Sequence, residues 1–286
     1  MTLLQLLTIT QNYFRKKGIE SARLDAELLL GHCLGLDRVG LYLEYDRPLL
    51  EHEVHAYREL VKRRAAHEPV AYIIGRRDFW TITLEISRGV LIPRPETEIL
   101  VERALAFLGG LDARQPRVLD IGTGSGAIAL ALASEMENLD IVALDASEQA
   151  AACARANAER LELSERVTVT QACFSDAFAQ TDARFDLIVS NPPYIPSGDI
   201  DHLASDVRDY EPLQALDGGQ DGLDIFRSWI PHCTALLDAG SVLMLEIGHD
   251  QGSAVSGLLA DSNCYADIEC IPDYAGLDRV VICRRN

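Results

Sequence analysis

The first 70 residues carry apolar positions at helical spacing and show no strand-like alternation. Leucines in the segment 3–7, together with Phe14, form one apolar face. Ser21 can cap a second helix over 22–34, and a third helix is expected over 51–67, between Pro48 and Pro69. The pattern therefore predicts a small helical bundle at the N-terminus.

From residue 71 the pattern changes to alternating, β-branched and aromatic positions. Residues 72–75 and 79–86 predict the two strands of a hairpin, joined by the polar segment 76–78. Pro93 and Pro95 then require extended backbone before a helix that begins near Glu96. We expect residues 71–91 to link the bundle to a larger domain.

Residues 92–286 alternate short apolar runs with helical segments. Strands are expected at 117–121, 140–145, 167–172, 185–190, 241–247, 265–271 and 278–284. Helices are expected at 97–108, 124–135, 147–160 and 222–237. Such alternation implies right-handed crossovers and an α/β fold whose mostly parallel sheet is covered on both faces. Residues 196–221 carry Pro, Gly and Asp and are expected to form a long loop over the site.

The charge balance limits the possible partners. The chain has 26 basic and 44 acidic residues, a formal net charge of −18, which disfavours extended contact with a nucleic-acid backbone. No apolar stretch has the length of a membrane span, and no signal segment follows Met1. Seven scattered cysteines without a CxxC pair favour reduced thiols in the cytoplasm and no metal site.

The tetrad Asn191-Pro192-Pro193-Tyr194 follows the apolar run 185–190. Two prolines cannot continue a strand, so the tetrad lies at its carboxyl end, where open α/β sheets bind ligands. The Asn oxygen and a proline carbonyl accept hydrogen bonds, and the tyrosine ring can lie against a flat group. This combination favours binding of a planar amide or amine nitrogen.

A second motif, Gly122-Thr123-Gly124-Ser125-Gly126, connects the strand 117–121 to a helix. Glycines permit a sharp bend and the close approach of a ligand, and the spacing also satisfies a dinucleotide-binding fingerprint. Asp120, before the glycines, can neutralise a positive charge, and a hydride-transfer enzyme has no use for an amide-binding tetrad. S-adenosylmethionine, which carries an amine and a cationic sulfur, fits both motifs.

Two further residues end the neighbouring strands. Asp145 can accept both ribose hydroxyls of a nucleoside, or it can cap the helix that follows it. Phe174 can pack on an adenine ring, or it can be an ordinary core residue. Glu246, at the end of the strand 241–247, could act as a base, but we interpret it as structural.

With these motifs, nearly the whole chain resembles the class I S-adenosylmethionine-dependent methyltransferases, and more narrowly the HemK/PrmC family. That family methylates the side-chain nitrogen of the glutamine in the Gly-Gly-Gln motif of bacterial class 1 peptide chain release factors. The resemblance rests on residues 92–98, 120–126, 191–195, 208, 211–216 and 273–280. It implies a seven-stranded Rossmann-like methyltransferase domain at 92–286, a β-hairpin linker at 71–91 and a helical domain at 1–70 that docks release factors.

The resemblance also implies roles for individual residues. The turn Gly122 to Gly126 and Asp120 would hold S-adenosylmethionine, Asp145 its ribose and Phe174 its adenine, and the product would be S-adenosylhomocysteine. The substrate amide would lie between Asn191, which also approaches the cofactor, and the Pro192 carbonyl. Pro193 and Tyr194 would complete that substrate site, with Tyr194 fixing the plane of the amide. Cys173 departs from the family pattern, because many relatives have an acidic residue there that contacts the adenine amino group.

Three alternatives remain open at this stage. An adenine-N(6) nucleic-acid methyltransferase would use the same tetrad on an exocyclic amine, although the acidic balance disfavours it. The chain could also be a non-catalytic module that holds the cofactor or a translation factor, or a nicotinamide dehydrogenase. We expect a monomeric cytoplasmic enzyme with no membrane contact and no direct nucleic-acid partner.

Overall fold

A computed structural model describes residues 1–111, 115–178 and 182–286 of the chain. The described residues divide into two compact units. The helical unit contains Met1–Arg76 together with Ala204–Tyr210, and the sheet unit contains Arg77–Leu203 and Glu211–Asn286. The expected linker at 71–91 is thus divided between the units after Arg76.

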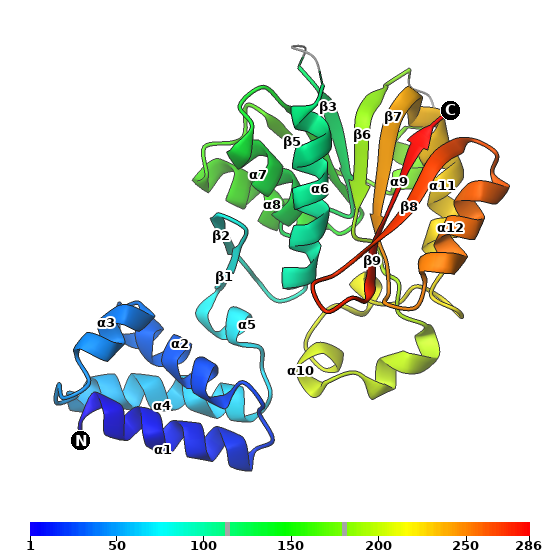
Figure 1. Ribbon diagram of the computed structural model, residues 1–286. Helices are drawn as coiled ribbons and strands as arrows, with labels where there is room; N and C mark the ends of the chain where they lie inside the picture. The colour runs from blue at the N-terminus through cyan, green and yellow to red at the C-terminus, as the bar shows by residue number, and fades with distance from the viewer. Residues whose placement is uncertain (112–114, 179–181) are drawn as a thin grey trace. The chain divides into compact units, whose positions relative to one another are not determined.

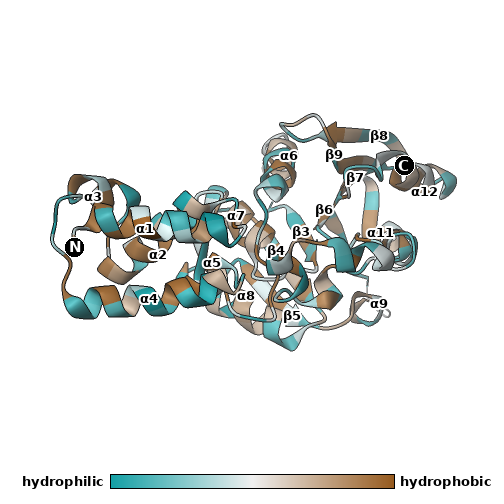
Figure 2. Ribbon diagram, turned by 90° about the horizontal axis from the view of Figure 1, so that it is seen from below, coloured by the Kyte–Doolittle hydropathy of each residue, from teal (hydrophilic) through white to brown (hydrophobic). Residues whose placement is uncertain are grey.

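Amphipathic helices build the helical unit around an apolar core. Its helices are α1 (Leu3–Lys16), α2 (Ala22–Leu34), α3 (Arg38–Leu43), α4 (Glu51–Ala65), α5 (Val70–Ile74) and α10 (Ser205–Arg208). Phe14 and Tyr57 are completely buried, and the Tyr57 hydroxyl donates to the Ala26 carbonyl at 3.1 Å. Helix α4 shows both hydrophilic and hydrophobic colours along its length (Figure 2), as expected for a helix with one buried face.

The prediction of a strand at 72–75 is wrong, because this segment forms the short helix α5. Pro69 precedes the helix, and Gly75 ends it in the left-handed conformation with a φ of 77°. Ile73 is buried in the core of the helical unit, so packing decides the conformation of this short apolar run. The hairpin consequently pairs β1 (Arg76–Phe79) with β2 (Ile82–Glu85).

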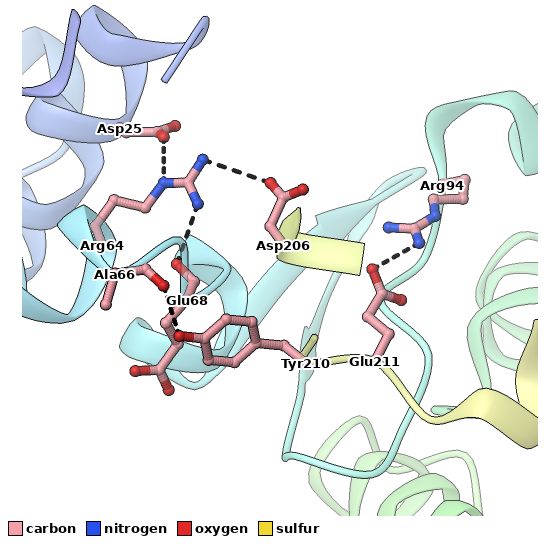
Figure 3. A network of polar contacts seen from close by, with 8 residues as sticks. All are labelled: Asp25, Arg64, Ala66, Glu68, Arg94, Asp206, Tyr210 and Glu211. Atoms are coloured by element: carbon pink, nitrogen blue, oxygen red, sulfur yellow. Dashed lines mark hydrogen bonds and ion pairs between the residues drawn. The ribbon is translucent and has the colours of Figure 1, made fainter. Parts of the chain in front are cut away.

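Segment 204–210 is held in the helical unit by polar contacts with the end of α4. Arg64 is buried and forms ion pairs with Asp25, at 2.7 Å, and with Asp206, at 3.5 Å. The Tyr210 hydroxyl donates to the Ala66 carbonyl at 2.7 Å (Figure 3). These contacts explain why a segment more than 100 residues away in the sequence belongs to this unit.

The sheet unit is built on a seven-stranded sheet with the order β5-β4-β3-β6-β7-β9-β8 among the described residues. Its strands are β3 (Arg117–Ile121), β4 (Asp140–Asp145), β5 (Val167–Gln171), β6 (Phe185–Ser190), β7 (Leu237–Glu246), β8 (Tyr265–Pro272) and β9 (Asp278–Arg285). The first five are parallel to one another, and β9 runs antiparallel to both β7 and β8. The predicted α/β fold with a mostly parallel sheet of seven strands is confirmed.

Helices cover both faces of this sheet (Figures 1 and 2). One face carries α6 (Glu98–Gly109), α7 (Ala127–Glu135) and α8 (Glu148–Arg160). The other carries α9 (Phe174–Ala177), α11 (Asp224–Leu236) and α12 (Gly252–Asp261). In the sheet, β4 and β5 lie on one side of β3, whereas β6 lies on its other side. The strand order therefore reverses between β3 and β6. Ligands bind at such a reversal, beyond the carboxyl ends of the strands.

Short helical turns complete the sheet unit. They are η1 (Pro95–Thr97), η2 (Ser197–His202) and η3 (Leu213–Ala215). The segment 196–221 is therefore more ordered than the long loop we expected, and Ile195 pairs with Asp217 in an isolated bridge. Within the described ranges, the helices are too short or too polar to span a bilayer.

Candidate active site

A cavity of about 270 Å³ lies at the carboxyl ends of β3, β4 and β6 in the sheet unit. Its wall combines the glycine turn after β3, the end of β4, the start of the tetrad and one side of α11. Segments 89–97 and 212–215 complete the wall. The strand reversal thus brings together motifs that lie about 70 residues apart in the sequence.

The glycine turn bends sharply beneath this cavity. Gly122, Gly124 and Gly126 have φ values of 72°, 61° and 87°, which residues with a Cβ rarely adopt. The N–H groups of Gly122 and the following residue both donate to the Leu144 carbonyl, at 2.8 and 2.9 Å. A Cβ on Gly126 would lie 2.7 Å from Leu130 Cδ1, so the turn also packs closely on its own helix.

Asp120 supports this turn from behind and does not face the cavity. Its side chain is completely buried, and it is absent from the described residues of the cavity wall. Its Oδ2 accepts from the Thr123 hydroxyl at 2.7 Å and from the Ala129 N–H at 3.3 Å. Burial raises the pKa of the Asp120 carboxyl to about 7. The carboxyl group therefore does not line the cavity, and the expectation that Asp120 offers its charge to a bound cation stays a prediction.

Asp145, in contrast, lies on the cavity wall. Its two oxygens accept from the N–H groups of Gly124, at 2.9 Å, and Ser147, at 2.8 Å. Each oxygen keeps a second lone pair that can accept a ligand hydroxyl. The cap of α8 is Ser147, whose hydroxyl accepts from the Ala150 N–H, so the alternative role of Asp145 as the helix cap is wrong.

An aromatic pair forms the apolar side of the cavity. Phe174 and Trp229 both line it, with ring centroids 5.5 Å apart at an angle of 72°. Phe174 is also part of the core, as one of the two sequence interpretations expected, and its packing on an adenine ring stays a prediction. Sequence reasoning missed Trp229, because no motif links α11 to the glycine turn. Cys173 has an exposed side chain and is absent from the described cavity wall.

The tetrad begins directly after the end of β6, which is hydrogen-bonded to β3. The Ser190 hydroxyl donates to the Ile121 carbonyl at 2.7 Å, which holds the end of β6 beside the glycine turn. Asn191 and Pro193 line the cavity, and Asn191 Nδ2 donates to Thr97 Oγ1 at 3.1 Å. Thr97 also lines the cavity and was not identified from the sequence.

The other two members of the tetrad are absent from the described wall of this cavity. Pro192 is buried. The ring of Tyr194 packs against the core of the sheet unit, and its hydroxyl donates to Glu246 Oε1 at 3.4 Å. Burial raises the pKa of the Tyr194 hydroxyl and raises the pKa of the Glu246 carboxyl to about 7.

The described residues offer no cluster of acidic, histidine and cysteine side chains that could bind a metal ion. They do fit a nucleoside with a cationic tail, because the wall combines a carboxylate, an aromatic pair and bare glycine backbone. Ser125 lines the cavity as well, and its buried Oγ has no hydrogen-bond partner among the described residues. A bound ligand can supply that partner.

Several known proteins are similar in sequence to this chain. Residues 5–75 match the PrmC N-terminal domain, and residues 99–206 match the methyltransferase small domain. A release factor glutamine methyltransferase of Geobacter sulfurreducens is 44% identical, covering 98% of this chain and 95% of the relative. One of Rhodopirellula baltica is 42% identical with the same coverage, 98% and 95%.

A solved structure shares the fold. The 16S rRNA N2 G1207 methyltransferase of T. thermophilus, in complex with AdoMet and guanosine, matches with a TM-score of 0.53 and 20% identity. The match covers 74% of this chain and 50% of that protein, and it concerns the fold alone. Identity above 40% over nearly the full length, together with both domain matches, shows that the chain belongs to the release factor glutamine methyltransferase family.

Proposed function

We propose that this protein transfers a methyl group from S-adenosylmethionine to the side-chain nitrogen of the glutamine in the Gly-Gly-Gln motif of class 1 peptide chain release factors. One observation carries the proposal beyond family membership. Asn191 shares a cavity with the glycine turn, and its Nδ2 is held by Thr97. The opposite end of the amide, Oδ1, is therefore available to accept a substrate N–H.

Different residues of the cavity wall would bind different parts of the cofactor. Asp145 would accept the ribose hydroxyls, and Phe174 with Trp229 would enclose the adenine. The glycine turn and Ser125 would bind the amino acid part. When bound, S-adenosylmethionine supplies a methyl group on a cationic sulfur that a nucleophile can attack directly.

The residues of the tetrad would activate a weak nucleophile. The lone pair of an amide nitrogen is delocalised into its carbonyl, so the substrate nitrogen needs accurate placement. Asn191 Oδ1 and the Pro192 carbonyl would each accept one of its N–H groups and direct its lone pair to the methyl group. Both oxygens also favour the positive charge that develops on the nitrogen. One proton is released to solvent after transfer, so no strong base is required.

We also propose that the helical unit docks the release factor. It matches the PrmC N-terminal domain, and its helix α3 exposes two apolar side chains, Val39 at 64% and Leu43 at 82%. Replacing both by serine should raise the KM for release factor by about tenfold and leave the affinity for S-adenosylmethionine unchanged, since the cavity belongs to the sheet unit. Steady-state kinetics with full-length release factor test this. An unchanged KM would assign docking to another surface.

The dispersed free cysteines support action in a reducing compartment, and we propose a monomer in the cytoplasm. The net charge of −18 disfavours the alternative of adenine-N(6) methylation of nucleic acid. Incubating the protein and labelled cofactor with release factor, DNA and RNA in parallel separates the two activities. Mass spectrometry of the release factor should locate the methyl group on the glutamine.

Asn191→Ala is the decisive variant. Loss of the acceptor oxygen should lower kcat by at least about a hundredfold, as for other groups that stabilise developing charge. The affinity for S-adenosylmethionine should change much less, because the remaining cavity wall is intact. Asn12→Ala, on the exposed side of α1, is the matched control and should turn over like the wild type. Near-normal turnover in Asn191→Ala would remove the assigned role.

A further inference from the structure

Gln251, at the start of α12, joins the end of the tetrad to two other segments of the sheet unit. Its side chain is buried, and its Nε2 donates to the Tyr194 carbonyl at 2.9 Å and to the Gly222 carbonyl at 3.3 Å. Its Oε1 accepts from the Gly248 N–H at 2.8 Å. This third bond fixes which end of the amide donates, because an amide oxygen only accepts. The N–H groups of Nε2 are therefore directed at the two backbone carbonyls.

The backbone beside Tyr194 is packed too closely for a side chain at two neighbouring glycines. A Cβ on Gly218 would lie 2.8 Å from Tyr194 Cα. A Cβ on Gly222 would collide with the Tyr194 carbonyl oxygen and with Gln251 Nε2. Gly222 also has a φ of 74°, which favours glycine. The tetrad therefore ends in a close-packed junction of backbone segments, with one buried amide at its centre.

The tetrad has little conformational freedom between its two ends. The proline rings fix φ at Pro192 and Pro193, and the residue before a proline is restricted to extended backbone. At the start of the tetrad, the Ser190 hydroxyl holds the end of β6 through the Ile121 carbonyl. A stiff segment that is held at both ends cannot rotate about its length. The bond at the Tyr194 carbonyl thus helps to decide where the Pro192 carbonyl points.

We propose that Gln251 is a positioning residue that sets the direction of the Pro192 carbonyl by holding the carboxyl end of the tetrad. This inference rests on the proposed function, in which that carbonyl accepts one N–H of the substrate amide. Gln251 is absent from the described wall of the cavity, so it acts through the backbone of Tyr194 and not by touching a ligand.

The cofactor side of the cavity is held by contacts of its own. The glycine turn and Asp145 are joined by a hydrogen bond of 2.9 Å. Helix α11, which carries Trp229, begins two residues after Gly222 and is kept in place by the buried side chain of Phe226. Loss of the Gln251 contacts should therefore affect the substrate nitrogen more than the cofactor.

Gln251→Met removes the three hydrogen bonds and keeps the length of the side chain. It should lower kcat for release factor by about tenfold, the equivalent of one hydrogen bond. The Kd of S-adenosylmethionine should change by less than about twofold, which also shows that the variant folds. An unchanged kcat in this variant overturns the proposal.

Two comparison variants exclude a general effect of substitution or of lost stability. Gln220→Met, at an exposed position two residues before Gly222, is the matched control and should turn over like the wild type. Tyr265→Phe removes a buried hydrogen bond from the Tyr265 hydroxyl to the Ile230 carbonyl of α11. It should lower stability and leave kcat unchanged. A loss of kcat in Tyr265→Phe equal to that in Gln251→Met overturns the positioning role.

Gln251→Glu keeps the size of the side chain and the acceptor for Gly248 but replaces the donors by a second acceptor. An ionised carboxylate would repel the Tyr194 carbonyl, whereas a protonated carboxyl can donate to it. Burial raises the pKa of such a carboxyl, so the kcat of Gln251→Glu relative to the wild type should rise as the pH falls from about 8 to about 6. Glu246 lies beside Tyr194 in both proteins, so its titration cancels in this ratio. A ratio that is independent of pH overturns the role of the donor.

Hydrogen exchange tests the same contact without an activity measurement. The Tyr194 carbonyl and the Ile195 N–H belong to one peptide group, and this N–H donates to the Leu216 carbonyl at 3.0 Å. Gln251→Met should loosen the group and accelerate exchange of the Ile195 N–H by about tenfold. Unaltered exchange overturns the proposal. If the wild type methylates no release factor, the proposed function fails, whereas this exchange still reports whether Gln251 holds the tetrad.

Discussion

Asp120 holds a carboxyl group below the glycine turn, where water does not reach it. In the folded protein its pKa is raised by burial to about 7, compared with an ordinary value of 3.8. Between these pH values the folded state binds a proton that the unfolded chain has lost. The free energy of unfolding therefore contains a part that is fully present below about pH 4 and is lost as the pH rises to about 7.

Asp120→Asn should remove this part, so its free energy of unfolding should fall less between pH 5 and pH 7 than that of the wild type. Glu246 and Asp145 also have raised pKa values and act in the same direction, so some dependence on pH should remain. Urea denaturation of both proteins at the two pH values measures the difference. Parallel pH dependence in the two proteins would show that Asp120 is not protonated in the folded state.

For single residues, the sequence predicts which strand ends meet at the cavity better than it predicts which other side chains pack there. Asn191, Asp145 and Phe174 each stand at the end of a predicted strand, so their meeting at one edge of the sheet follows from the topology. Their roles stay predictions. Thr97 and Trp229 reach the same cavity from a helical turn and a helix with no motif, through packing that spacing along the chain does not reveal.

The strand-turn-helix element formed by β3, the glycine turn and α7 depends on a backbone that only glycine adopts freely. Gly126 has a φ of 87°, and a Cβ there would lie 2.7 Å from Leu130 Cδ1. Gly126→Ala should lower the free energy of unfolding by about 1–3 kcal/mol. It should also weaken the binding of S-adenosylmethionine, because the turn must shift. Denaturant midpoints and calorimetric titration measure the two effects.

Gly257→Ala is the matched control for this element. Gly257 lies in α12, and a Cβ there would meet no atom within 4 Å. Alanine should therefore stabilise the protein by up to about 1 kcal/mol through its higher helix propensity. Equal effects of both substitutions would mean that the strain at Gly126 is small.

Strongly periodic elements were predictable, and short ones were not. The seven strands of the sheet follow the predicted positions within a few residues, because each is a buried or alternating run between turn signals. Helix α5 was predicted as a strand, since a short apolar run between Pro69 and Gly75 satisfies both patterns. Helices α3 and α12 were not predicted, because α3 has only six residues and α12 has no side-chain cap at its start.

Family and fold could be predicted for the whole molecule, whereas its division into two units was not fully predicted. The proline-rich segment, glycine turn and tetrad point to one family, and the relatives confirm this over nearly the full length. No local pattern indicates that segment 204–210 belongs with the N-terminal helices. Its membership rests on single contacts such as that between Arg64 and Asp206, which are separated by 142 residues.

Arg64→Met tests how this segment is held. The substitution leaves Asp25 buried without its ion-pair partner, which should destabilise the helical unit by about 3–5 kcal/mol. Hydrogen exchange of residues 204–210 and of α2 should accelerate, because Asp206 also loses its contact. Arg58→Met, at an exposed position of the same helix, is the control and should leave this exchange unchanged.

The same variant shows whether the release of this segment spreads to the cavity. The chain re-enters the sheet unit at Glu211, whose Oε1 pairs with Arg94 at 2.6 Å (Figure 3). The Oε2 atom of Glu211 accepts from the Ile92 N–H at 3.3 Å. These contacts hold the chain immediately before Pro212, the first residue of the loop that lines the cavity. Arg64→Met should therefore bind S-adenosylmethionine like the wild type, whereas Arg94→Met, which loosens Glu211, should bind it more weakly. Isothermal titration of both variants decides the matter, and a large loss of affinity in Arg64→Met would mean that Glu211 does not isolate the cavity from the segment.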